Sequence, residues 1–375
     1  MIDNSRLMKT PKSVEIEITN YCNLRCLYCS HFSSPGEVNR DLSLDEWLQF
    51  FGELKDCAVM DVTLSGGEPF LRKDIREIID GIVRNRMRYS ILTNGTLITD
   101  ELASFIASTG RCNMIQISVD GSNSEVHDSC RGEGSFQKAI EGILHLTRHS
   151  IPVFPRVTIH KDNVKDLEAI AKLLLDDLGL PGFSTNSASH LGMCRNNRSI
   201  QLSVEDRMEA METLVRLTEK YGDRISALAG PLADARIWSM MENARLKGVK
   251  EIAGRGALTG CRCYMEKIAV RADGVIIPCP HLGHIALGRI NQDSLRDVWQ
   301  YHPELATLRS RINIPLKDFE FCRGCDYVQY CTGNCPGLAY TLLGKVNHPS
   351  PDACFRCFLS EGGKLPVAAL SHNNR

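Results

Sequence analysis

Three cysteines separated by gaps of three and two residues stand near the amino end of the chain, in the run CNLRCLYC. This spacing lets one short loop bring the thiolates of Cys22, Cys26 and Cys29 around a single iron–sulfur cube. Fully ligated cubes take four cysteines, so one iron is left open, and an open metal position is where chemistry occurs. A structural zinc knuckle, with His31 as its fourth ligand, is the alternative that the run leaves open.

A second group of cysteines lies in the last third of the chain. The segment ADGVIIPC, which runs to Cys279, predicts a hairpin that delivers a ligand. The chain has 16 cysteines and no apolar export signal, so metal ligation is favoured over disulfide bonds. Two zinc ribbons would also suit part of the spacing. The other candidate ligands are Cys261, Cys263, Cys322, Cys325, Cys331, Cys335 and Cys354, with Cys357 as an extra thiol.

The overall composition excludes some classes of partner. The 44 basic and 45 acidic residues nearly cancel, for a net charge of −1. Nothing here favours a nucleic-acid partner or an anionic membrane surface. No apolar run of about 18 residues occurs, so no membrane span is predicted. The polar amino end predicts a cytoplasmic protein.

Strands and helices alternate through the first half of the chain. Strands are predicted at 14–19, 59–65, 89–93, 114–120, 153–160 and 182–188. Helices are predicted after the capping box of Ser43 and Glu46 and at 74–86, 101–108, 136–149 and 164–178. Strict alternation means right-handed crossovers and a parallel sheet. Six such units, too few for a closed barrel, predict an α/β fold with an open partial (β/α)6 barrel whose functional loops follow the C-terminal ends of the strands.

The chain divides into four expected parts. Residues 12–200 form the barrel, and residues 201–260 form a helical bridge in which no strand is expected. Residues 261–360 are rich in cysteine and turns, and such a segment needs metal to fold. Residues 361–375 form a tail that we expect to be frayed.

Two of the candidate motifs follow successive strands, which places them on the same rim of the sheet. The three-cysteine loop follows the first strand, and Ser65-Gly66-Gly67-Glu68-Pro69 follows the second. The two glycines permit a close backbone approach to a ligand, and Glu68 offers a carboxylate at the rim.

Together these motifs resemble the radical S-adenosylmethionine (SAM) superfamily, over roughly residues 12–200. The resemblance implies that Cys22, Cys26 and Cys29 hold a 4Fe–4S cluster whose open iron is chelated by SAM. It further implies that Tyr28 lies near the adenine, and that Gly66, Gly67 and Glu68 receive the SAM amino group. Ser118 and Asp120 match the region that binds the ribose, and Arg131, in an expected turn, would pair with the SAM carboxylate. Asp120 could instead serve only a turn, Ser118 only the strand, and Thr93-Asn94-Gly95 only turn chemistry.

The C-terminal cysteines resemble the SPASM domain, an auxiliary iron–sulfur module of some radical SAM enzymes. This resemblance implies two further 4Fe–4S clusters. One would be bound by Cys261, Cys263, Cys279 and Cys335, and the other by Cys322, Cys325, Cys331 and Cys354. Cys261 or Cys263 could instead complete a cluster with an open site, and Cys357 could replace Cys354.

The resemblance implies reductive cleavage of SAM to a 5′-deoxyadenosyl radical, which removes hydrogen from a substrate. Because SPASM-bearing members mostly modify peptides or proteins, we expect a ribosomally made peptide or protein that is oxidised or crosslinked. The auxiliary clusters would transfer electrons, and an external flavodoxin or ferredoxin would donate them. Sulfatase maturation is disfavoured, because Pro280 and His281 follow Cys279 where an aspartate would be expected.

Two alternatives stay open. One is modification of a tetrapyrrole, as in heme biosynthesis, or of another small molecule. The other is a non-catalytic iron–sulfur electron carrier or zinc-binding scaffold. No residue is assigned as a catalytic base, and His281 and His284 are expected to face solvent.

Overall fold

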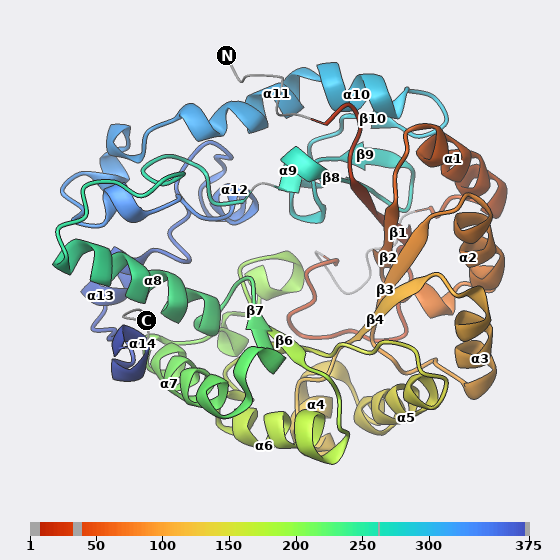
Figure 1. The fold of residues 1–375 in the computed structure, drawn as a ribbon, viewed down its shortest axis with the longest axis horizontal. Helices are drawn as coiled ribbons and strands as arrows, with labels where there is room; N and C mark the ends of the chain where they lie inside the picture. The colour runs from red at the N-terminus through yellow and green to blue at the C-terminus, as the bar shows by residue number, and fades with distance from the viewer. Residues whose placement is uncertain (1–7, 33–39, 262, 372–375) are drawn as a thin grey trace.

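A curved arc of mostly parallel strands forms the centre of the molecule (Figure 1). The computed structural model describes residues 8–32, 40–261 and 263–371. Four strands pair in parallel and in chain order, namely β1 (Ser13–Thr19), β2 (Asp61–Gly66), β3 (Arg88–Thr93) and β4 (Cys112–Ile117). A second parallel sheet contains β5 (Arg156–Ile159), β6 (Phe183–Ser187) and β7 (Ile225–Ala227).

Two parallel bridges join the sheets, between Ile115 and Val153 and between Ser118 and Arg156. The strands therefore follow one another around a single open barrel. All six predicted strands are present, with ends that differ by a few residues, and the predicted partial barrel is confirmed.

Helices lie on the outer side of this arc (Figure 1). They are α1 (Leu44–Asp56), α2 (Ile75–Arg84), α3 (Asp100–Thr109), α4 (Ser124–Arg131), α5 (Ser135–Arg148) and α6 (Leu167–Lys172). The predicted capping box is present, since Ser43 and Glu46 bond each other's backbone. The apolar face of α1 is fully buried against the sheet at Trp47, Phe50 and Leu54, which fixes the outer layer on β1 and β2.

Two elements differ from the expectation. Arg131 is the last residue of α4, not part of a turn, and Gly132 caps that helix. The helical bridge contains α7 (Val204–Tyr221) and α8 (Pro231–Leu246), but it also contributes strand β7, which pairs with β6. A three-residue strand is too short to produce an alternating pattern that the sequence could show.

The C-terminal part is built on short elements around the cysteines. They are α9 (Cys263–Glu266), β8 (Lys267–Val270), β9 (Val275–Ile277), β10 (Gly288–Arg289), α10 (Leu295–Tyr301), α11 (Pro303–Ser310), α12 (Pro336–Leu343), α13 (Phe355–Ser360) and α14 (Val367–Ser371). The predicted hairpin is present as β8 and β9. Strand β8 also pairs in parallel with β1, so the main sheet has the order β10-β9-β8-β1-β2-β3-β4. The expectation of a frayed tail fails at α14, whose Ala369 is buried in the core.

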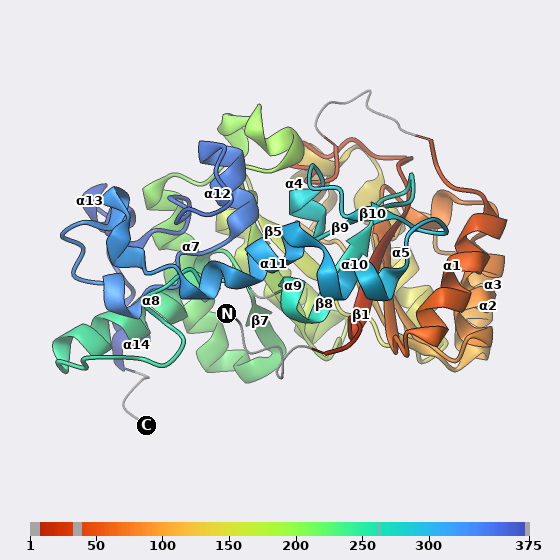
Figure 2. The same ribbon diagram turned by 90° about the horizontal axis from the view of Figure 1, so that it is seen from above.

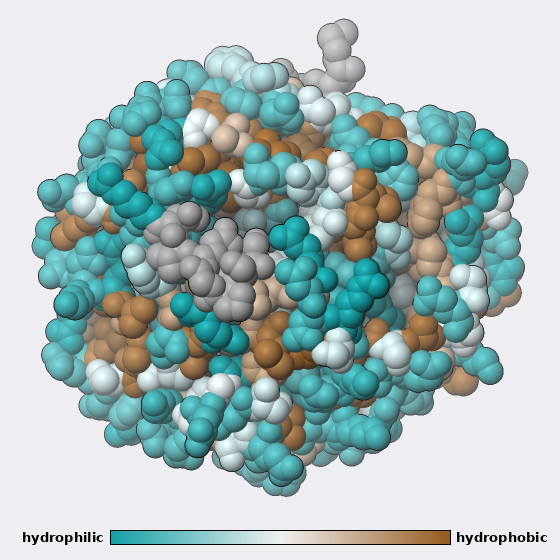
Figure 3. All heavy atoms as spheres, turned by 180° about the vertical axis from the view of Figure 1, so that it is seen from behind, coloured by the Kyte–Doolittle hydropathy of each residue, from teal (hydrophilic) through white to brown (hydrophobic). Residues whose placement is uncertain are grey.

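Different helices lie toward the two ends of the molecule. Figure 2 shows α12 and α13 at one end and α1, α2 and α3 at the other. On the face shown in Figure 3, hydrophilic side chains cover most of the area, and hydrophobic residues form small separate groups. No helix in the described ranges is long and apolar enough to cross a membrane.

Candidate active site

The three-cysteine loop leaves the C-terminal end of β1 and folds back on itself. The backbone N–H of Cys29 donates to the carbonyl of Cys26 (3.1 Å), and the N–H of Leu24 donates to Sγ of Cys22 (3.4 Å). Burial raises the pKa of Cys26 to about 11, and the charges of Cys29 and Cys22 add to this effect. Grouped, partly exposed thiols of this kind are deprotonated when a metal binds them, so the donor set suits an iron–sulfur cluster.

Gly66 and Gly67 lie against the backbone of the cysteine loop. A Cβ at Gly67 would lie 2.0 Å from the carbonyl oxygen of Tyr21, and Gly66 has a φ of +115°. The N–H of Gly67 donates to Thr19 (2.8 Å), and the N–H of Glu68 donates to Tyr21 (2.8 Å). The glycines therefore allow the turn after β2 to support the loop after β1.

The carboxylate of Glu68 is fully buried and accepts three hydrogen bonds. Its Oε1 accepts from the hydroxyl of Thr93 (2.7 Å) and from the N–H of Phe70 (3.1 Å). Its Oε2 accepts from the N–H of Asn94 (2.8 Å). Burial raises the pKa of Glu68, although these bonds oppose the shift. The side chain thus ties the rim of β2 to the rim of β3.

Asn94 connects this network to the cysteines. Its Nδ2 donates to Oδ1 of Asn23 (2.9 Å) and lies 3.9 Å from Sγ of Cys22. Thr93 and Asn94 therefore do more than form the turn after β3. Their place after a strand was visible in the sequence, but their partners were not.

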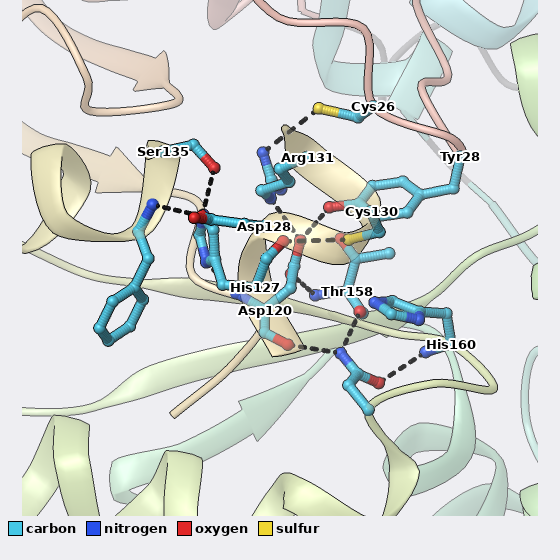
Figure 4. Close-up of polar contacts among 12 residues, drawn as sticks. Cys26, Tyr28, Asp120, His127, Asp128, Cys130, Arg131, Ser135, Thr158 and His160 are labelled. Carbon is cyan, nitrogen blue, oxygen red and sulfur yellow. Dashed lines mark hydrogen bonds and ion pairs between the residues drawn. The ribbon is translucent and has the colours of Figure 1, made fainter. Parts of the chain in front are cut away.

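Asp120 is the centre of a second buried network (Figure 4). Its Oδ2 accepts from Nε of Arg131 and from the hydroxyl of Tyr28. Its Oδ1 accepts from the N–H of Thr158 (2.7 Å), and its own N–H donates to Nδ1 of His127 (3.2 Å). Burial alone would raise the pKa of Asp120, but the charge of Arg131 keeps that pKa below its usual value.

Arg131 extends from the end of α4 toward the cysteine loop (Figure 4). Its Nη1 lies 3.8 Å from Sγ of Cys26, and its guanidinium carbon lies 5.4 Å from the centre of the Tyr28 ring. The carbonyl of Cys130 accepts from the N–H of Leu27 (3.0 Å), which joins the same helix to the loop.

The predicted SAM contacts are therefore brought to one rim of the sheet. Tyr28 and Arg131 both donate to Asp120, and Glu68 lies in the adjacent network. Ser118 follows β4, where its N–H donates to the carbonyl of Thr93 (3.1 Å). Their contacts with SAM itself stay predictions.

The concave face of β1 carries two carboxylates. Glu15 and Glu17 alternate with the buried Ile16 and Ile18, so they point away from the covering helices. Oε1 of Glu15 accepts from the hydroxyl of Ser65 (3.2 Å). Burial and then the charge of Glu17 raise the pKa of Glu15.

Basic side chains face these carboxylates from other parts of the chain. Lys267 of β8 and Arg156 of β5 oppose the rise in the pKa of Glu15, and Nδ1 of His31 lies 3.6 Å from Glu17. The inner side of the barrel below the cysteine loop is therefore polar and charged.

Four C-terminal cysteines, Cys261, Cys263, Cys279 and Cys335, lie close enough to affect one another's pKa values next to β8, and we call them the inner cage. A hydrogen bond with Cys261 lowers the pKa of Cys263. A hydrogen bond with Cys279, together with burial, outweighs this effect and raises the pKa of Cys263 overall. The charge of Cys335 also acts on Cys263. Arg311 is 1% exposed, and the charges of Cys335 and Cys261 act on the pKa of its guanidinium. Its Nε has no hydrogen-bond partner among the described residues.

The other four cysteines form an outer cage around one cavity. Cys322, Cys325, Cys331 and Cys354 all line this cavity, together with Met241 of α8 and Arg356. Burial raises the pKa of Cys322 to about 12, and the charges of the other three add to the rise. Cys357 is hydrogen-bonded to the thiol of Cys354, so Cys357 lies beside the cage. Four thiols that line one cavity fit a ligated 4Fe–4S cluster.

Comparison with known proteins decides the family. Residues 16–174 match the model of the radical SAM superfamily, and residues 261–326 match the SPASM iron–sulfur cluster-binding domain. The chain belongs to the radical SAM superfamily. As a radical SAM enzyme with a SPASM domain, it uses 4Fe–4S clusters and SAM.

Relatives of this radical SAM chain fall into two groups by name. The AdoMet-dependent heme synthase of Methanosarcina barkeri is 27% identical over 93% of this chain and 98% of its own length. The PqqA peptide cyclase of Rhizobium meliloti is 24% identical over 96% of this chain and 91% of its own length. The structure of Streptococcus suis SuiB bound to precursor peptide SuiA has a TM-score of 0.73 at 16% identity, over 94% of this chain and 78% of that one. This structural likeness shows a shared fold.

Proposed function

We propose that this radical SAM enzyme removes hydrogen from a peptide or protein segment bound inside the partial barrel. The observation that carries the proposal is the pair of carboxylates, Glu15 and Glu17, on the concave face of β1. Amide N–H groups and a basic side chain of a peptide can bond to both. The names of several relatives, the PqqA peptide cyclase among them, support the same class of substrate.

We assign the ligands from the cysteine groups described above. Cys22, Cys26 and Cys29 hold the cluster that binds SAM, and the inner and outer cages each hold an auxiliary cluster. When bound, the first cluster and SAM supply the radical that takes a hydrogen atom from the substrate. The protein supports this step by its own contacts: Asn94 and Arg131 donate toward the sulfurs of Cys22 and Cys26, and Tyr28, Gly66, Gly67, Glu68, Ser118 and Asp120 form the rim that receives SAM.

A tetrapyrrole is the second candidate substrate. It is favoured by the match to the AdoMet-dependent heme synthase, which covers almost the whole of both chains. Glu15 and Glu17 on β1 oppose it, because the propionate groups of a tetrapyrrole carry the same charge, whereas Lys267 and Arg156, which face Glu15, offset part of this repulsion.

The test compares the two substrate classes directly. Anaerobically reconstituted protein is given SAM and dithionite with either a deuterated precursor peptide encoded beside its gene or iron-coproporphyrin. We expect deuterium from the peptide in 5′-deoxyadenosine and a loss of hydrogen mass from the peptide. Decarboxylation of the porphyrin with an unchanged peptide would contradict the proposal.

We also infer that an external flavodoxin or ferredoxin donates electrons in the cytoplasm. Support comes from a surface hollow formed by the segment between Cys325 and Cys331 and by the end of α8, lined in part by Arg245, Lys250 and Asp326. The hollow lies beside the outer cage, and its exposed Lys250 suits an acidic carrier, whereas Arg245 is paired with Glu242.

A further inference from the structure

We propose that Asp120 is a positioning residue that holds Arg131 against the sulfur of Cys26, and that Arg131 thereby raises the reduction potential of the amino-terminal cluster. The inference rests on the proposed function, because it takes Cys22, Cys26 and Cys29 to be the ligands. It assigns to Asp120 a role toward the protein and the cluster beyond the expected contact with a ribose.

The carboxylate of Asp120 already accepts three hydrogen bonds. It is 0% exposed, and its two oxygens accept from Arg131, Tyr28 and the N–H of Thr158. Removing one of these donors from the buried charge would be unfavourable, so the carboxylate has a role within the protein itself. The bonds that exist run toward the cysteine loop, on which Tyr28 stands one residue before Cys29.

The contact with Asp120 fixes the direction of the guanidinium. The group is planar, so a bond at Nε determines where the other two nitrogens lie. With Nε held by Asp120, Nη1 lies 3.8 Å from Sγ of Cys26. The side chain of Arg131 is 7% exposed, so no water layer screens its charge from the sulfur.

The backbone supports the same geometry. The N–H of Asp120 donates to His127 and the carbonyl of Cys130 accepts from Leu27, so α4 is attached both to the end of β4 and to the cysteine loop. Arg131 therefore cannot move away from Cys26 unless several bonds break together.

The physical consequence concerns the electron that the cluster accepts. Reduction adds negative charge to the cluster and its thiolates, and a nearby cation or N–H donor stabilises the reduced form more than the oxidised form. Hydrogen bonds to the sulfurs and local charge are known determinants of such potentials. Arg131 therefore makes the cluster easier to reduce. Asp120 maintains this effect because it holds the side chain of Arg131 in place.

The test measures the midpoint potential of the amino-terminal cluster without SAM, by EPR-monitored redox titration. We expect Arg131→Gln to lower this potential by at least 59 mV, which is a tenfold change in a one-electron equilibrium. Asp120→Asn should also lower it, although the loss of the negative charge of Asp120, which acts directly on Cys26, would by itself raise it. The double variant should lower the potential no further than Arg131→Gln alone, because Asp120 supports the potential through Arg131.

The matched control is Asp234→Asn. Asp234 is likewise a buried carboxylate bonded to an arginine, Arg207, at 2.7 Å, but it lies between α7 and α8. The variant Asp234→Asn should leave the midpoint potential of the amino-terminal cluster unchanged. The auxiliary clusters of every variant serve as internal references. If Asp120→Asn does not fold, Asp120→Glu, which keeps the charge but displaces it, replaces it and should give a smaller shift of the same sign.

Two failures can be told apart. An unchanged potential in folded variants that retain the cluster would overturn the positioning role and leave the proposed function intact. Wild-type protein whose Cys22, Cys26 and Cys29 carry no cluster would instead refute the ligand assignment on which both depend.

Discussion

Gly67 approaches Tyr21 so closely that a Cβ on the glycine would lie 2.0 Å from the carbonyl oxygen of Tyr21. Tyr21 directly precedes Cys22. The turn after β2 and the loop after β1 are therefore fitted to each other at the backbone, and the second motif supports the first.

We predict that Gly67→Ala displaces the cysteine loop. The added methyl group would overlap backbone, which cannot rotate out of the way as a side chain could. The variant should lose the iron of the amino-terminal cluster and its cleavage of SAM, while the iron of the C-terminal domain remains. Iron analysis and EPR check this, and Gly52→Ala is the control, because its Cβ would meet nothing within 4 Å.

We predict that Glu68→Gln destabilises the fold by about 1–3 kcal/mol. The three groups that point at this carboxylate are all donors, so the amide NH₂ of glutamine would meet one of them and leave it unsatisfied. Denaturant unfolding measures the loss. Glu101→Gln, at a position whose side chain is 80% exposed, should change the stability by no more than about 0.5 kcal/mol.

His127 should make stability depend on pH. Burial, and then the charge of Arg131, lower the pKa of His127 to about 4, although Asp120 and Asp128 oppose the shift. The charge of His160 also lowers this pKa. The unfolded chain takes up a proton as the pH falls through about 6.5, whereas the folded chain does so only near 4. Stability present above pH 6.5 is therefore lost as the pH falls toward 4, by at most about 1.4 kcal/mol per pH unit.

The variant His127→Gln should flatten this dependence. Urea unfolding of both proteins between pH 4 and 7 measures the two slopes, and equal slopes would contradict the assignment of the effect to His127.

Cys26→Ala should abolish SAM cleavage and leave the auxiliary clusters in place. The cysteine is part of the amino-terminal group alone, and both C-terminal cages are formed by other cysteines. Formation of 5′-deoxyadenosine under dithionite is the measurement. Cys57→Ala, at a buried isolated thiol, should retain it.

Lys250→Glu should slow reduction of the clusters by an acidic flavodoxin or ferredoxin but not by dithionite. The residue is exposed and lines the hollow beside the outer cage. Stopped-flow reduction at increasing salt checks the electrostatic origin, because added salt should narrow the difference in reduction rate between the wild-type protein and the variant. Lys138→Glu on α5 is the matched control, and an equal effect there would argue against this docking face.

The sequence predicted the elements that have a strong local pattern. Alternating apolar residues in β1 and the capping box of Ser43 and Glu46 are local properties, and the structure confirms both. The spacing of Cys22, Cys26 and Cys29 likewise belongs to one loop. The rim position of Glu68 followed from strand order, and that of Asp120 from the resemblance to the radical SAM family.

The contacts between distant residues could not be predicted in this way. Helix α4 has a polar sequence without an apolar stripe, although Asn123 and Gly132 were usable cap signals at its two ends. The bonds of Asn94 to Cys22 and of Arg131 to Cys26 join residues that are 72 and 105 positions apart in the chain. Such pairings depend on how the strands curve into a barrel.

The parallel pairing of β8 with β1 has a consequence for any attempt to divide this protein. Lys267 to Val270 occupies the edge of the very strand from which the amino-terminal cysteine loop emerges, and the N–H of Leu295 donates to Glu53 on α1 (2.6 Å). A fragment cut off before residue 261 would leave β1 with bare backbone groups, and such edges invite intermolecular sheet formation. The amino-terminal and C-terminal cysteine groups therefore belong to one folding unit.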